Sequence, residues 1–402
     1  MEERAFKNTL EDYRGSTFLG EDKKLQKQYQ EQVLTGVRKL QENVCQNASD
    51  DGRDYSVYTG AAGQALLCLQ LHTKLPGGDK DDHYLQQALT WLKPCLKRLK
   101  GSKLSFLCGD AGPLAIAAVV HHLLGNKERS KTFISKVEDL CRDVCADSDM
   151  PDEILYGRCG YLSALLFLQH YLSPDAVDRE LIVKVVEAVL SSGETLSRRQ
   201  RCSHPLMYEW HDKPYLGAAH GLAGIYYMLL QVKEAGVQER VRQLVHPCVD
   251  FMLSLRFASG NCPSSLGSSG GDRLVHWCHG APGWVHLFAL AYKIYKDKRY
   301  LEAALDCGRV VWQRGLLCKG YGLCHGTAGN AYTFLTLFKL TGEQRYLYYA
   351  YKFAEWCCDY GKHGCRTPDR PFSMFEGMAG TVYFLVDLLD PYKSAFPAFD
   401  FM

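Results

Sequence analysis

The fold is decided by two stretches of similar sequence, WCHGAPGWVHLF at residues 277–288 and LCHGTAGNAYTF at residues 323–334. Each contains a glycine, two further residues, a second glycine and then a mainly apolar run. The pattern occurs at five other places, and successive first glycines are 46 to 64 residues apart. An internal repeat of this length is typical of stacked helical hairpins. The seven pairs are Gly60/Gly63, Gly109/Gly112, Gly157/Gly160, Gly221/Gly224, Gly280/Gly283, Gly326/Gly329 and Gly377/Gly380.

The segments after and between the glycine pairs have different hydrophobic patterns. The run after each pair is nearly all apolar, which predicts a helix that is buried all round. The segments between them, such as residues 298–315, place apolar residues at helical spacing and charged residues on the other face. We therefore predict an all-α fold, an α/α toroid of seven helical hairpins with fourteen helices in an inner and an outer ring. An open solenoid of the same hairpins is the alternative, but inner helices without a polar face need mutual burial.

Length, charge, apolar runs and cysteine content indicate the domain organisation and the compartment of the chain. We expect residues 1–402 to form a single domain, with residues 1–30 partly irregular. The net charge of +2 argues against a nucleic-acid-binding surface. The N-terminus has no apolar signal segment, and no apolar run is long enough for a transmembrane span. The 17 scattered cysteines indicate free thiols in a reducing compartment. A cytoplasmic protein is expected, with peripheral membrane association left open.

A closed ring would bring one end of all seven inner helices together. Each inner helix begins at its glycine pair and runs in the same direction, so the residues before the first glycines should meet at one end of the axis. These residues are Thr59, Cys108, Tyr156, His220, Cys278 with His279, Cys324 with His325, and Glu376.

Two of these positions carry a metal-binding pattern. Cys-His-Gly occurs at 278–280 and again at 324–326, in equivalent positions of neighbouring repeats. Cysteine and histidine are preferred zinc ligands, and a helix N-terminus favours a thiolate. Four ligands would give a closed structural site, whereas three would leave a position open for a substrate. The alternative is buried cysteines and hydrogen-bonded histidines near tight turns, but two such pairs in register favour a metal.

The motifs resemble those of lanthionine synthetase C-like proteins, the eukaryotic relatives of bacterial lanthipeptide cyclases. The resemblance covers essentially the whole chain. It departs at residues 58–63, YTGAAG, where the family usually has YTGWAG; this affects packing more than chemistry. Besides the glycine pairs it rests on GAAHG (217–221), HWCHGAPG (276–283), GYGLCHGTAGN (320–330), KHGCRTPD (362–369) and FEGMAGT (375–381).

The resemblance implies one zinc per chain, held by Cys278, Cys324 and His325, with the fourth position open to water or a substrate thiol. It also implies that His279 is not a ligand and that His220, the histidine of GAAHG, donates or accepts a proton. A glutathione pocket is carried over to five residues, namely Lys319, Arg366, Thr367, Pro368 and Asp369.

A zinc-held thiol is deprotonated, and its natural reaction partner is a carbon electrophile. We expect a zinc-dependent enzyme of the glutathione transferase type that forms thioethers with dehydroamino acids in proteins or with small electrophiles. Attack on a dehydroamino acid leaves an enolate that needs a proton, and histidine titrates near neutrality. A non-catalytic zinc and glutathione sensor, or an adaptor for signalling proteins, is the alternative. Peptide cyclisation is less favoured because nothing in the chain supplies a dehydratase.

Charged residues around the predicted mouth suit glutathione. Lys319 and Arg366 could hold its two carboxylates, with the arginine as a bidentate fork. Asp369 could face its amine. The sequence leaves open whether Glu376 and Arg4 take part in the site.

Overall fold

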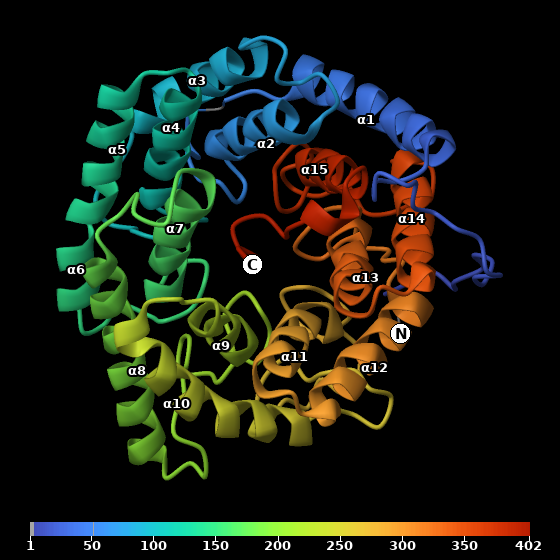
Figure 1. Ribbon diagram of the computed structural model, residues 1–402. Coiled ribbons are helices and arrows are strands. Elements are labelled where there is room, and N and C mark those ends of the chain that lie inside the picture. Colours follow the sequence, from blue (N-terminus) through green and yellow to red (C-terminus); the bar gives the residue numbers. More distant parts are fainter. Residues whose placement is uncertain (1–3, 51) are drawn as a thin grey trace.

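The helices are arranged as two concentric rings (Figure 1). The structure is a computed structural model that describes residues 4–50 and 52–402, and within them it has fifteen α-helices and one 3-10 helix. The predicted all-α toroid is confirmed. The inner ring consists of α2 (Ala61–Lys74), α4 (Ala111–Leu123), α7 (Arg158–Tyr171), α9 (Leu222–Leu230), α11 (Ala281–Tyr295), α13 (Thr327–Thr341) and α15 (Met378–Leu388). The outer ring consists of α1 (Lys27–Asn47), α3 (His83–Leu96), α5 (Lys127–Asp139), α6 (Cys141–Ala146), α8 (Arg179–Gln200), α10 (Ala235–Ser254), α12 (Lys298–Arg314) and α14 (Gln344–Cys358), and the 3-10 helix η1 (Pro391–Lys393) follows α15.

The two rings differ in burial as their sequences predict. Each inner helix begins one or two residues after the first glycine of its pair. Eleven of the fifteen residues of α13 are buried, whereas α12 buries seven of seventeen, all on one face. No described helix is long and apolar enough to cross a lipid bilayer.

The fifteenth helix results from a break in the outer ring. The outer segment from 127 to 146 is divided at Leu140 into α5 and α6. The Leu140 N–H donates to the carbonyl of Val137 at 3.3 Å, three residues back rather than four, and this tighter turn ends α5. Both pieces occupy one outer position, so seven hairpins remain.

The ring is closed by the first and last helices of the chain. α1 packs against α14 and α15, and α15 packs against α2 (Figure 1). The seventh hairpin therefore joins opposite ends of the sequence. A side chain at Gly36 of α1 would collide with the Cys358 thiol of α14, so glycine allows these helices to approach closely. The described chain before α1, residues 4–26, contains no helix, and residues 1–3 of the segment expected to be irregular lie outside the described residues.

The second glycine of each pair lets the preceding loop pack against the first turn of its own helix. A Cβ atom at Gly329 would lie 1.7 Å from the carbonyl oxygen of Leu323, six residues earlier, and the second glycine of every other pair meets the equivalent carbonyl. Each loop thus folds back over the first turn of its own helix. In α13 the N–H groups of residues 327–329 donate to the carbonyls of residues 320–322. The loop satisfies the donors that a helix start leaves unpaired. The closest approach at these glycines is therefore to the helix's own loop.

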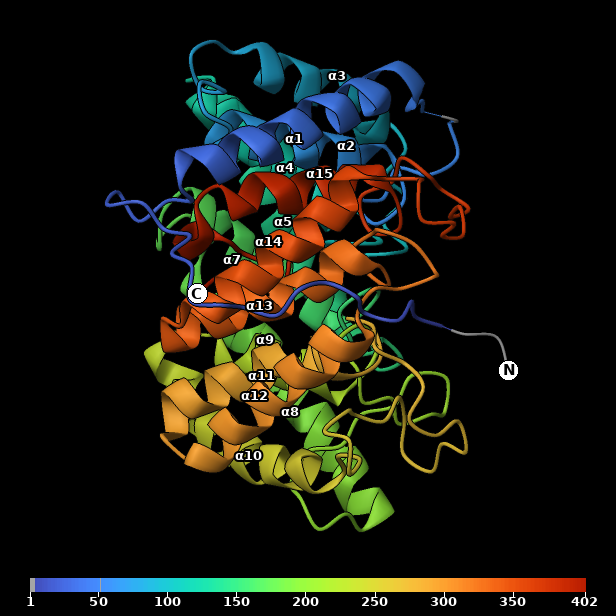
Figure 2. The ribbon, with the colours of Figure 1, turned by 90° about the vertical axis from the view of Figure 1, so that its right-hand side faces the viewer.

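Backbone hydrogen bonds join the loops of neighbouring repeats at this end of the ring. They fix the main chain of both metal-loop cysteines, and they include a bond between the last repeat and the first. Figure 2 shows these loops gathered at one end of the helices. The bonds are Tyr58 N–H to Leu107 O (2.9 Å), Ile154 N–H to Ala219 O (3.1 Å), Cys278 N–H to Cys324 O (3.2 Å), Cys324 N–H to Phe375 O (2.8 Å) and Phe375 N–H to Tyr58 O (3.0 Å).

The C-terminal tail fills the axis of the ring, where Figure 1 places the C-terminus. Phe396 and Phe399 are buried, and the ring of Phe396 stacks on that of Trp277 at 4.8 Å. Asp400 forms an ion pair with Lys339 of α13 at 3.2 Å. The tail is therefore part of the core rather than a free segment.

Candidate functional site

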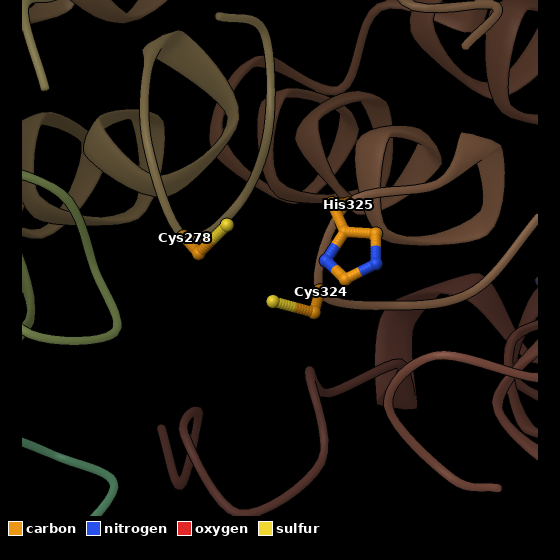
Figure 3. Close-up of side chains that lie close together, drawn as sticks. All are labelled: Cys278, Cys324 and His325. Carbon is orange, nitrogen blue, oxygen red and sulfur yellow. The ribbon is translucent and has the colours of Figure 1, made fainter. Parts of the chain in front are cut away.

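Cys278, Cys324 and His325 converge at the loop end of the ring. Their ligand atoms all lie within 4.8 Å of one another. Figure 3 shows the three side chains pointing toward one another from the two loops that precede α11 and α13. Cys278 and Cys324 are only 8% and 3% exposed. The convergence follows from the fold, because the two loops belong to adjacent repeats and their cysteines share a backbone hydrogen bond.

The donor set fits zinc in kind and in spacing. With sulfur at about 2.3 Å and nitrogen at about 2.0 Å from a tetrahedral zinc, donors lie roughly 3.3–3.8 Å apart, so a small closing movement suffices. Burial raises the pKa of the Cys324 thiol, and the Cys278 thiol beside it raises the pKa further. Two neighbouring buried thiolates therefore need a cation between them, and coordination would supply it.

His279, the neighbour of Cys278, does not belong to this group. Its ring lies 5.8 Å from that of Tyr215, and its Nδ1 atom is buried with no hydrogen-bond partner in the described part of the chain. Burial, followed by the nearby His276, lowers the pKa of His279 to about 4. The two loops differ at the next residue: Gly280 has a φ of +119°, whereas Gly326 has a φ of −134°.

His220 lines the same cavity as the two cysteines and His325, and this cavity has a volume of about 310 Å³. The Nδ1 atom of His220 lies 2.6 Å from Oε2 of Glu153, whose side chain is buried. A carboxylate only accepts hydrogen bonds, so Nδ1 carries a proton and Nε2 is left for a ligand or substrate.

Glu153 is a site residue that the sequence reasoning missed. It precedes the first glycine of its pair by four residues, a position that Ser56 and Ser105 occupy in the first two repeats. Those serines accept hydrogen bonds from the backbone N–H three residues on, and Glu153 accepts the equivalent bond from Tyr156 at 2.5 Å. The longer side chain leaves its second oxygen for His220. Aligning the repeats would have revealed this difference.

Two aromatic rings lie parallel to the His220 ring. Trp210 lies 5.5 Å from it with an interplanar angle of 2°, and Tyr156 lies 6.3 Å from it with an angle of 7°. The sequence placed Tyr156 at the mouth but gave no sign of Trp210, which comes from the loop after α8. Together with Glu153 these rings fix the orientation of the His220 imidazole.

A larger, cationic cavity adjoins the site. Its volume is about 890 Å³, and it shares Arg4, His276 and Lys319 with the cavity around His220. Arg366 also lines it, and its main chain is held by a 2.8 Å bond to the carbonyl of Cys318. The structure therefore brings Lys319 and Arg366 to one cavity.

The other residues carried over for glutathione lie outside that cavity. Thr367 and Asp369 are exposed and Pro368 is half-buried. Asp369 forms an ion pair with Arg366 at 3.4 Å, and Arg366 is 67% exposed. Asp369 also lines a separate small cavity beside Gly60.

The N-terminal segment positions Arg4. Ala5 pairs with Leu317 in an antiparallel bridge, the Phe6 N–H donates to the carbonyl of Leu316 at 2.8 Å, and the Cys318 N–H donates to the carbonyl of Arg4 at 3.1 Å. The N-terminal segment thus lies alongside residues 316–318, which directly precede Lys319. Arg4, whose part the sequence left open, lines both cavities.

Residues 51–401 match the family profile described as lanthionine synthetase C-like protein. The chain is 46% identical to the Glutathione S-transferase LANCL1 of Danio rerio over 409 residues, which cover 99% of each chain. Among solved structures, nisin cyclase resembles it with a TM-score of 0.64 and 17% identity, over 90% of this chain and 94% of that one. The likeness to nisin cyclase concerns the fold alone.

Proposed function

Because the chain belongs to the lanthionine synthetase C-like family, we propose that it is a zinc-dependent enzyme that activates the thiol of glutathione for thioether formation. One observation supports this above all: Cys278, Cys324 and His325 converge within 4.8 Å at a cavity that His220 and Lys319 also line. The name of the relative from Danio rerio supports glutathione as the thiol. The electrophile is a dehydroamino acid in a protein or a small unsaturated compound.

Zinc held by Cys278, Cys324 and His325 would keep a thiol deprotonated at neutral pH, where a free thiol with a pKa of about 8.5 is mainly protonated. The protein's contribution is to hold the three donors ready. Backbone bonds from Cys278 to Cys324 and from Cys324 to Phe375 fix both loops. A site on such a rigid support keeps its geometry during the reaction.

His220 would complete the reaction by delivering a proton. Once sulfur bonds to the β-carbon of a dehydroalanine, the π bond breaks and the α-carbon must be protonated. Glu153 holds Nδ1 of His220, so Nε2 is the atom that delivers the proton. The proton lost by the thiol is thus balanced by the proton gained at carbon.

The cationic cavity would bind the glutathione carboxylates. Arg4 and Lys319 line both this cavity and the one beside the cysteines, so they can hold a carboxylate while the thiol reaches the metal group. Arg366 would exchange its contact with Asp369 for a carboxylate, which leaves Asp369 for the amine. Contacts from Thr367 and Pro368 stay predictions.

Thioether formation tests this function. Glutathione and a dehydroalanine peptide are incubated with the zinc-loaded chain, and the adduct is measured by mass spectrometry. We expect turnover by the native chain and by Cys357→Ala, which removes a buried cysteine of α14 away from the site. Cys324→Ala should lose both zinc and turnover. His220→Asn should keep its zinc and slow the reaction by about 10²–10⁴-fold.

The outcomes separate the two functions considered. A zinc-loaded native chain that binds glutathione but forms thioether no faster than buffer is a sensor and not this enzyme. If the His220→Asn variant reacts at the native rate, His220 has only a structural role in packing. Running the reaction in heavy water adds a second readout, because delivery by one group labels a single face of the α-carbon.

A further inference from the structure

A groove lies on the Trp210 side of the site. It consists of two cavities, of about 440 and 750 Å³, which share Asp149, Met150, Pro151, Trp210 and His211. The larger cavity extends along α8, and the smaller one ends at Tyr156. We call this the Trp210 groove. It has no lining residue in common with the cationic cavity.

The aromatic wall of the Trp210 groove borders His220. Trp210 and Tyr156 line the groove, and the planes of both rings are parallel to that of His220. The cavity that holds His220 also holds the metal group. His220 itself lines neither groove cavity, so a substrate end that lies against these two rings is one aromatic ring away from the group that delivers the proton, while glutathione enters from the cationic cavity.

An unusual turn presents Trp210 to the groove. Trp210 and Lys213 exchange two backbone hydrogen bonds, of 3.0 and 3.2 Å. The two residues between them, His211 and Asp212, have φ values of +49° and +54°. Left-handed conformations are costly for residues other than glycine. Two in succession, next to a ring that orients His220, indicate a turn kept for the site.

The two approaches to the site carry opposite charge. Asp147, Asp149 and Asp212 are exposed residues of the groove, and Asp149 and Asp212 form no ion pair within the described residues. The lysine of the smaller cavity, Lys103, lies over the ring of Tyr156 at 5.2 Å. Arg199 lines the larger cavity. The cationic cavity, by contrast, is lined by arginines and lysines with a single carboxylate, Asp272, which is paired with Arg314.

Building on the function proposed above, we propose that the Trp210 groove binds the electrophile as an extended polypeptide segment. The dehydroalanine lies at the His220 end, and lysine or arginine residues beside it in the sequence face Asp149 and Asp212. The groove continues from Tyr156 along α8, and Asp212 lines only the part without Tyr156, so a chain can use this carboxylate and a compact electrophile at the aromatic end cannot. Its charge repels glutathione, which keeps the two substrates on separate paths.

The chemistry needs nothing further. The glutathione sulfur bonds to the β-carbon of the dehydroalanine, the carbon–carbon π bond breaks, and the proton lost by the thiol is replaced by one at the α-carbon. No oxidant or reductant takes part. The product is a polypeptide that carries glutathione through a thioether.

Binding of unreactive peptides tests the groove without turnover. Two fluorescent peptides carry alanine in place of dehydroalanine, one flanked by arginines and the other by glutamates, and anisotropy gives their affinities. We expect the arginine peptide to bind at least about tenfold more tightly at low salt, and less so as salt screens the charges. The double variant Asp149→Lys/Asp212→Lys should remove this preference. The matched control Glu128→Lys/Asp143→Lys reverses two exposed carboxylates of α5 and α6 outside the groove and should keep it.

Equal affinity for the two peptides, or a preference that survives in the double variant, would overturn the proposal. Turnover by the native chain with a small dehydroalanine derivative separates this outcome from failure of the enzyme function. Adduct from the small compound together with equal peptide affinities rejects the groove and keeps the enzyme. Selective binding of the arginine peptide without adduct from any electrophile keeps the groove and rejects the enzyme.

Discussion

The loops before α11 and α13 have the same Cys-His-Gly sequence, yet only one of their histidines joins the metal group. His325 lies with the two cysteines, whereas His279 lies beside Tyr215. The first glycine of the α11 loop has a left-handed φ, and that of the α13 loop is extended. Like residues at equivalent positions thus serve different purposes because the backbone under them differs.

The difference begins upstream of the loops. The first N–H groups of α13 donate to carbonyls of their own loop, whereas the Ala281 N–H of α11 donates to the side chain of Asn261 at 3.0 Å. Asn261 comes from the long loop after α10, and its Nδ2 atom also donates to the carbonyl of Leu274 at 3.0 Å. A segment with no counterpart in the next repeat therefore shapes the α11 loop.

The largest expected effect separates the two histidines. His325→Ala should lower zinc affinity by more than about 100-fold, because loss of a ligand costs at least as much as loss of the groups that support ligands. His279→Ala should keep close to one zinc per chain. Metal analysis after dialysis against a competing chelator measures both. If His279→Ala loses zinc as His325→Ala does, the site has four protein ligands and no open position.

A smaller effect, on the pH dependence of stability, distinguishes α11 from α13. Position 286 of α11 is a histidine where the equivalent position of α13, 332, is a tyrosine. Burial lowers the pKa of His286 to about 4. The unfolded chain takes up this proton near pH 6.5, so the native protein loses stability as the pH falls from about 6.5 to about 4. The loss attributable to this residue should reach about 2–3 kcal/mol.

Denaturant unfolding of the native chain and His286→Phe across this range measures the effect. Protonation of the metal ligands contributes equally to both proteins and cancels in the difference. The variant should gain stability relative to the native chain as the pH falls. If the unfolding free energies of the two proteins change equally with pH, His286 is protonated in the folded protein as readily as in the unfolded chain.

The smallest effect concerns the side chain that caps α11. Asn261→Ala should cost about 1–2 kcal/mol of unfolding free energy, since it removes the acceptor for the Ala281 N–H. Asn43→Ala, at an exposed position of α1, should change stability by less than about 0.5 kcal/mol. Equal stability of both variants would show that the α11 loop holds its shape without Asn261.

Much of the fold could be predicted because its signal is local. A glycine pair followed by an apolar run marks the start of every inner helix, and the spacing leaves room for one outer element. The pairing of α1 with α15 has no such signal, since it depends on how far the ring turns before it closes. The break at Leu140 has none either, because the same residues could continue a helix.

The candidate site divides in the same way. Cys278, Cys324 and His325 could be identified from the sequence, because they belong to a motif that occupies equivalent positions in two neighbouring repeats. The contact between Glu153 and His220 is not visible in this way, because it exists only once the ring brings their two loops together; the two residues are 67 positions apart. Trp210 lies in the same loop as His220, but no motif marks it. The Ala281 N–H after Gly280 bonds to Asn261, 20 residues earlier, whereas the first N–H groups of α13 bond to their own loop, so the repeat alone could not assign the ligand histidine.

The most direct test is whether the glutathione sulfur reaches the metal held by the two loops. Cobalt is substituted for zinc, and the absorption of the protein is followed during titration with glutathione and, separately, with S-methylglutathione. The account predicts an added sulfur-to-cobalt charge-transfer band with glutathione alone, and no such band in Cys324→Ala, which cannot hold the metal. Spectra that respond identically to both compounds, while calorimetry shows that glutathione binds, would contradict activation of the thiol by this metal group.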